Sequence, residues 1–160
     1  MADASLRSVT PVIRRATADD LPRVVALIVA GSLDGRVWDD ASLPLDRRYY
    51  DAFAAMSVDP DFALMVAEID GEVVGTFQIA VIKNLHHHGE SVAQVESVHV
   101  AESMRNRGIG EAMMRWAMDE ARRRGCFRLQ LTSNAARADA HRFYKRLGFE
   151  GSHVGFKLTL

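Results

Sequence analysis

The chain has 160 residues, of which 48% are apolar and 26% charged, and its formal net charge is -1. This size and composition are typical of one soluble globular domain, and the near-neutral charge argues against a nucleic-acid-binding module or a protein drawn to an anionic membrane. A single cysteine excludes an intrachain disulfide, and no apolar run approaches the ~18 residues that span a bilayer, so we expect a cytoplasmic protein without a signal peptide.

The N-terminal part predicts a tail followed by two helices. We expect residues 1–8 to form a flexible tail and residues 9–160 to form a single domain, because no repeat or linker divides the chain. A short extended segment, Val12 to Arg15, precedes the first helix. That helix has N-cap candidates up to Asp20, Pro22 in its first turn and Gly31 as its stop. The second helix is expected from Asp46 to Met56, where aromatic residues recur every three or four positions.

The middle of the chain predicts an antiparallel meander, and the rest predicts alternating helices and strands. Asp70-Gly71 is a strong two-residue hairpin signal. The expected strands are Phe62–Ile69, Val73–Ile82, Ser91–Val100, Phe127–Thr132 and Val154–Leu160, with helices from about Ile109 to Arg124 and from Arg137 to Leu147. This order predicts an α+β (mixed α/β) fold with one parallel strand pair and helices on both faces of a mixed sheet.

A glycine-rich turn lies between the expected strand 91–100 and the following helix. It reads Arg105-Asn106-Arg107-Gly108-Ile109-Gly110. A helix start offers unpaired N–H groups and a partial positive charge, glycines let a ligand approach the backbone, and the arginines add charge. The turn therefore suits a phosphate group, although glycines that merely permit a tight turn are the alternative.

Two motifs in this chain resemble the GNAT superfamily of N-acetyltransferases. Its signature is Arg or Gln, two residues, Gly, one residue, then Gly or Ala, which Arg105, Gly108 and Gly110 match. A later helix ends Tyr144-Lys145-Arg146-Leu147-Gly148-Phe149, which is also similar to the superfamily. The resemblance covers nearly the whole chain and implies a splayed mixed sheet of about six to seven strands. It also implies acetyl-CoA as the cosubstrate and, by analogy, a homodimer.

The same resemblance implies where acetyl-CoA binds. The gap between strands 91–100 and 127–132 would hold the pantetheine against the backbone of Val98 and Val100. Asn134 matches a position whose side chain contacts the pantetheine arm. The pyrophosphate would be bound by N–H groups of Gly108, Ile109, Gly110 and Glu111, with Arg105 and Arg107 beside them.

Acetyl transfer to an amine needs a base, because a free alkylamine is mostly protonated at neutral pH. Glu96 is our candidate for the base, with a structural hydrogen bond or ion pair as the alternative. On a regular strand Gln94, Glu96, Val98 and Val100 share one face, so Glu96 would lie near the thioester and His99 would point away. Tyr144 matches the superfamily tyrosine that protonates the leaving thiolate, with a core aromatic of an amphipathic helix as the alternative.

A narrower resemblance concerns the acceptor. The segments 131–134, 139–144 and 152–157, with the histidine run 86–88, are similar to bacterial aminoalkylphosphonate N-acetyltransferases. This implies a small amine with an anionic group as the acceptor. Candidate acceptor contacts are Tyr50, His87, His88 and His153, and the histidines could act through a divalent metal ion. A solvated hairpin is the alternative for the histidine run.

Two other functions are compatible with the same motifs. One is a protein or peptide N-acetyltransferase. The other is a degenerate acyl-CoA-binding regulator without turnover, and Glu96, Tyr144 and the intact phosphate turn argue against it.

Overall fold

The computed structural model describes residues 10–32 and 38–160. Its helices are α1 (Leu21–Ala30), α2 (Arg47–Ser57), α3 (Ile109–Arg123) and α4 (Ala138–Arg146). Its strands are β1 (Val12–Arg15), β2 (Phe62–Ile69), β3 (Glu72–Ile82), β4 (Ser91–Val100) and β5 (Cys126–Leu131). None of the helices in these ranges has both the length and the apolar character that crossing a membrane requires.

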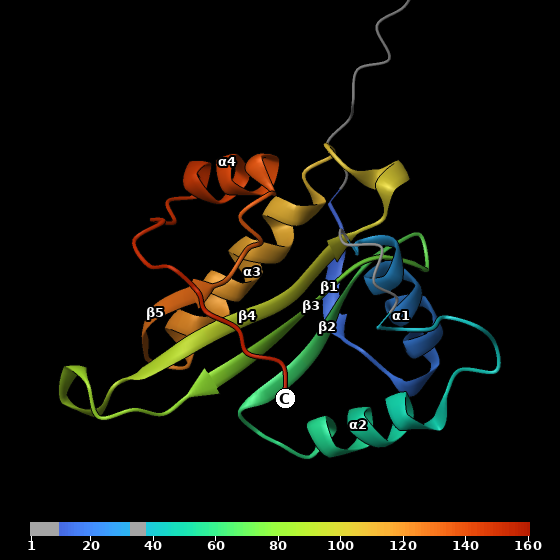
Figure 1. Ribbon diagram of the computed structural model, residues 1–160, viewed down its shortest axis with the longest axis horizontal. Helices are drawn as coiled ribbons and strands as arrows, with labels where there is room; N and C mark the ends of the chain where they lie inside the picture. The colour runs from blue at the N-terminus through green and yellow to red at the C-terminus, as the bar shows by residue number, and fades with distance from the viewer. Residues whose placement is uncertain (1–9, 33–37) are drawn as a thin grey trace, which may run out of the picture.

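The five strands form one mixed sheet in the order β1-β2-β3-β4-β5. The neighbours from β1 to β4 are antiparallel, and β4 and β5 are parallel because α3 connects them. Helices α1 and α2 cover one face of the sheet and α3 and α4 the other (Figure 1). The predicted α+β class and the single parallel pair are confirmed.

Each face of the sheet has its own core. The alternation of β2 divides its side chains: Met65 and Ala67 pack under α3, while Leu64 and Val66 pack under α1. Phe77 and Met113, both fully buried, occupy the centre of the core under α3. The sheet is therefore fixed from both sides, and the strand register at its centre is well determined.

The start of α1 is fixed by a buried carboxylate. Asp20 accepts hydrogen bonds from the Thr17 amide (2.7 Å) and hydroxyl (3.0 Å), and Arg14 of β1 donates two more at 2.7 and 3.0 Å. Arg14 also bonds to Glu68 of β2 at 2.7 Å. These bonds hold the pKa of Asp20 at about 2, with the Arg14 bond as the largest cause.

A β-bulge interrupts β4 at Ser97, which has a φ of 52°. Glu96 pairs with Gln78 and His99 pairs with Thr76, so Ser97 and Val98 together stand opposite Phe77. The extra residue reverses the alternation. Glu96 and His99 lie on the α1 face, whereas Val98 and Val100 pack into the core under α3. The expectation that Glu96, Val98 and Val100 share one face, with His99 on the other, is therefore wrong.

The expected strand Val154–Leu160 is not formed, so the sheet has five strands instead of six or seven. Residues 151–160 have no regular secondary structure and are all exposed. Apolar residues alternate in this segment, as they do in a half-buried strand, but a strand also needs a hydrogen-bonded neighbour. Among the described residues the segment pairs with no strand, and at Gly155 it passes Thr132, just beyond the end of β5.

Candidate active site

A cavity lies where β4 and β5 separate. Their pairing stops at Val95 and Leu131, while β4 continues to Val100. The cavity at this opening has a volume of about 270 Å³ and is lined by Ala30, Gly31, Ser32, Val98, His99, Val100, Arg105 and Arg137. Beyond Leu131 no strand of the described chain covers this edge of β4, so its backbone can pair with an extended ligand.

The predicted phosphate turn connects β4 to α3 at one end of this cavity. Its backbone makes a tight turn, with positive φ angles at Asn106 (60°) and Gly108 (84°). Gly108 is the N-cap of α3 and makes no side-chain cap hydrogen bond, so the first N–H groups of the helix are available to an anion. Arg105 bonds through Nε to the Val100 carbonyl at 3.4 Å, which places its charge between the turn and β4.

Other predicted cofactor residues also have roles within the protein. A Cβ at Gly110 would stand 3.4 Å from the ring of Phe143, an ordinary contact between α3 and α4. Glu111 pairs with Arg115 at 2.6 Å. The Asn134 side chain accepts a bond from the Ala136 amide at 2.9 Å and shapes the turn before α4. Arg107 is half-buried in the turn itself.

Glu96, the candidate base, ends a chain of side-chain hydrogen bonds that crosses from β5 to β4. Gln130 donates to Gln94 at 2.8 Å, and Gln94 donates to Glu96 at 2.7 Å. Glu96 is exposed and lies on the same face of the sheet as α1. Its carboxylate is therefore oriented by neutral amides.

Tyr144, the candidate acid, lies on α4 between two aromatic rings. Its ring meets Phe143 and Phe149 edge to face, with centroids 5.1 and 5.7 Å away. Burial raises the pKa of the Tyr144 hydroxyl, and the positive charge of Arg137 opposes this shift. The hydroxyl is accordingly protonated at neutral pH, as a proton donor must be.

His99, Arg137 and Gly31 also line the cavity, and the sequence did not predict them as site residues. Arg137, at the start of α4, donates a hydrogen bond to the Gly31 carbonyl at the end of α1 and so joins the two helices across the cavity. Burial lowers the pKa of His99, and the charges of Arg137 and Arg105 lower it further, while Asp39 opposes them. His99 reaches this position because of the bulge, and the periodicity of the sequence does not predict the bulge.

The predicted acceptor residues are not brought together by the structure. The His87 ring stacks on Phe127 (centroids 3.9 Å apart) at the paired end of β4 and β5. The part of β4 from Ser91 to Glu96 alone is about 16 Å long, at a rise of about 3.3 Å per residue. His87 is therefore far from Glu96 and from the cavity at the other end of β4. His88 is exposed beside His87, Tyr50 is exposed on α2, and neither lines the cavity.

His153 is exposed, and its Nδ1 lies 2.7 Å from the Ser152 hydroxyl. Two residues later the chain passes Thr132 at the open end of β5. Within residues 10–32 and 38–160, no three His, Cys, Asp or Glu side chains are grouped closely enough to hold a metal ion. The histidines thus do not form a metal site in this part of the chain.

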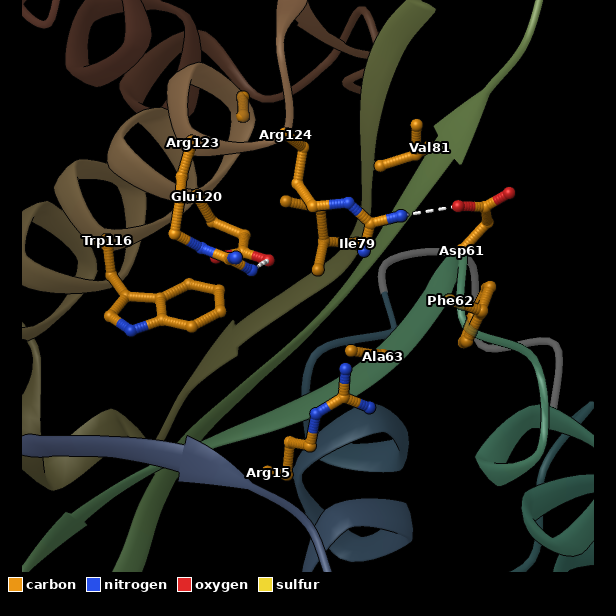
Figure 2. Close-up of a pocket in the computed structure, with 11 residues that line it drawn as sticks. Arg15, Asp61, Phe62, Ala63, Ile79, Val81, Trp116, Glu120, Arg123 and Arg124 are labelled. Atoms are coloured by element: carbon orange, nitrogen blue, oxygen red, sulfur yellow. Dashed lines mark hydrogen bonds and ion pairs between the residues drawn. The ribbon is translucent and has the colours of Figure 1, made fainter.

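A second cavity, of about 150 Å³, lies between the C-terminal end of α3 and the strands β1 to β3 (Figure 2). Its charged side chains point toward one another. Arg124 bonds to Asp61, and Arg123 bonds to Glu120 at 2.5 Å. These ion pairs leave Arg15 as the one charged lining residue without an ion pair in the described chain, and the cavity is remote from the phosphate turn.

The splayed parallel pair, the free edge of β4 and the anion-binding helix start define a class of protein that transfers acyl groups from coenzyme A. Residues 32–149 match the family described as Acetyltransferase (GNAT) family. The chain therefore belongs to the GNAT family. It is an acyltransferase that uses acetyl-CoA as its cosubstrate.

Individual relatives agree with this assignment. The chain is 34% identical to an aminoalkylphosphonate N-acetyltransferase of Salmonella typhimurium, over 92% of this chain and 90% of that protein. It is 27% identical to the uncharacterized N-acetyltransferase YjgM of Escherichia coli, over 93% and 86% of the two chains. The crystal structure of a transcriptional regulator from Bacillus halodurans C-125 superposes with a TM-score of 0.89 at 36% identity, covering 94% of this chain and 99% of that one.

Proposed function

We propose that the enzyme transfers the acetyl group of acetyl-CoA to the primary amine of a small molecule that carries an anionic group, such as an aminoalkylphosphonate. The observation that carries this proposal is the cavity at the end of β4, where Arg137 faces the opening. Its only hydrogen-bond acceptor among the described residues is a neutral backbone carbonyl. Its positive charge is therefore available to an anion. The name of the Salmonella relative supports the same substrate class.

The proposed reaction is a direct transfer in a ternary complex. The turn at Gly108 would hold the pyrophosphate, and the free edge of β4 at Val98 and Val100 would hold the pantetheine. Glu96 would attract the ammonium group and is a candidate to accept its proton, directly or through water. After the amine attacks the thioester, Tyr144 would protonate the departing sulfur. Binding both substrates side by side supplies much of the acceleration, without a covalent intermediate.

A comparison of acceptors tests the substrate class. We expect aminoethylphosphonate to give at least about tenfold higher kcat/KM than propylamine, a difference of about 1.4 kcal/mol. This preference should be lost in Arg137→Ala and kept in Arg142→Ala, because Arg142 is exposed and its partner Asp139 lies on the same helix. The assay follows thiol release from acetyl-CoA, with and without a chelator.

Each outcome of this comparison has a meaning. A preference for propylamine, or for peptides, would contradict the anionic small-molecule acceptor and leave the acetyltransferase standing. Equal rates with and without the chelator would remove only the metal ion. Tight binding of acetyl-CoA without thiol release for any amine would favour a non-catalytic regulator.

We also propose a homodimer, because apolar side chains gather on the exposed C-terminal segment.

A further inference from the structure

His99 is the ionisable side chain of the cavity that the reaction above does not use. It lines the cavity together with Val98 and Val100, the strand residues proposed to hold the pantetheine. Because of the bulge at Ser97 it lies on the same face of the sheet as Glu96. It is therefore beside the position where the proposed function brings the amine to the thioester.

A gap at the end of α1 accommodates the His99 ring. A Cβ at Gly31 would lie 2.1 Å from Nδ1 and 2.7 Å from Cε1 of His99, distances that no real structure permits. Gly31 has a φ of −89°, a backbone conformation open to any residue. The glycine is thus needed for the space that the imidazole fills. Helix α1 and strand β4 together fix the position of the ring.

The surroundings of His99 favour its neutral form. Arg137 and Arg105 bring two positive charges near it, Asp39 brings one negative charge, and Glu96 lies on the same face of its own strand. Within the described chain no side chain or backbone group forms a hydrogen bond with the His99 ring. A ligand in the cavity would therefore displace no hydrogen bond of the described chain in order to reach the imidazole.

We propose that His99 accepts a proton from the substrate ammonium. This inference rests on the proposed function. The ammonium loses two protons in the reaction. The first passes to an imidazole nitrogen of His99 and then to solvent, which frees the lone pair to form the C–N bond. As the C–S bond breaks, Tyr144 gives its proton to the CoA sulfur. The second proton leaves the nitrogen through the same His99, now neutral again, to solvent, and Tyr144 takes up one proton from solvent, so one proton is released in total.

This assignment gives Glu96 and His99 different roles. Glu96 attracts the ammonium by charge, so Glu96→Gln should mainly raise KM for the amine. His99→Gln keeps the size and polarity of the side chain but removes the base, so we expect kcat to fall by at least about 10²-fold. The acid limb of the pH profile should also change. Protonation of His99 stops the parent enzyme at low pH, whereas the variant lacks that titration.

Substitutions of two glycines test whether activity depends on the position of the His99 ring, separately from its ability to accept a proton. Gly31→Ala keeps His99 but displaces its ring, and we expect kcat to fall by at least about tenfold. Gly151→Ala is the matched control, because a Cβ at Gly151 meets nothing within 4 Å and its kcat should equal the parent value. Added imidazole should partly restore the activity of His99→Ala, in proportion to the neutral imidazole present. Affinity for acetyl-CoA, measured by calorimetry, should be unchanged in all these variants.

The results distinguish this inference from the proposed function. A parent enzyme that acetylates no amine would remove the proposed function. An active parent with His99→Gln at parental kcat and an unchanged acid limb would overturn the role of His99 alone. A loss of kcat by the same factor at every pH, without rescue by imidazole, would make His99 a structural residue and would also overturn the inference.

Discussion

Tyr144 is held in place by aromatic packing and not by its hydroxyl, for which no hydrogen-bond partner is present in the described chain. Tyr144→Phe keeps the ring contacts with Phe143 and Phe149, so the free energy of unfolding should change little. We expect kcat to fall on the order of 10²-fold if protonation of the thiolate limits the rate.

Steady-state kinetics with a thermal unfolding curve would check this expectation, and calorimetry with acetyl-CoA would show whether the cofactor site is intact. An unaltered kcat at full stability would mean that water, and not Tyr144, delivers the proton.

At the scale of single residues, the site could be predicted where the role of a residue depends on a local sequence motif. Gly108 has the left-handed backbone that favours glycine, and Arg105 lies beside β4, as the motif around them indicated. His99 and Arg137 escaped prediction for different reasons. The orientation of His99 depends on a bulge, and Arg137 meets Gly31 across 106 positions of the chain. A contact between residues so far apart in the sequence cannot be predicted from the residues that surround either of them.

Among the elements, the best predicted are those with a strong signal at both ends. Strands β2 and β4 have the expected bounds, and α1 ends at Gly31 as its sequence indicated. The prediction of a C-terminal strand was wrong. Alternating apolar residues indicate that a segment can be extended, but whether it has a hydrogen-bonded neighbour depends on the rest of the fold.

The contact between β1 and the start of α1 predicts a pH-dependent stability. The pKa of Asp20 is lowered from 3.8 to about 2, so its ionised form stabilises the fold above pH 4, and this contribution is lost as the pH falls toward 2. Asp20→Asn should lower the free energy of unfolding by about 2 kcal/mol at pH 7. Its deficit relative to the parent should shrink as the pH falls below 4.

Urea unfolding at pH 7, 5, 4 and 3 measures this difference. Asp119→Asn is the matched control, since the Asp119–Arg122 pair is exposed on one helix and should contribute little at any pH. A deficit for Asp20→Asn that stayed constant down to pH 3 would rule out ionisation as its cause.

At the scale of the whole molecule, the exposed C-terminal segment predicts self-association. Val154, Phe156, Leu158 and Leu160 alternate along it and are 79–112% exposed. Apolar surface of this extent, beside the unpaired edge of β5, favours pairing with a second copy of the chain. We expect a dimer at micromolar concentrations and a monomer for the double variant Phe156→Asp, Leu158→Asp.

Light scattering coupled to size exclusion would give both masses. Lys157→Ala lies between the two substituted positions and should leave the parent mass unchanged. A parent that remains monomeric at every concentration, or a double variant that remains dimeric, would contradict this assembly.

The bulge at Ser97 has a consequence for how substitutions and length changes act on this enzyme. Two residues of β4 share one position opposite Phe77, and the pairs on either side are regular. Removing one of the two would leave Glu96 opposite Gln78 and His99 opposite Thr76, with both side chains facing as they do now. The bend between them would disappear, and with it the local backbone geometry at the mouth of the cavity. The shape of the site at this point is therefore set by the number of residues in the strand more than by their identity.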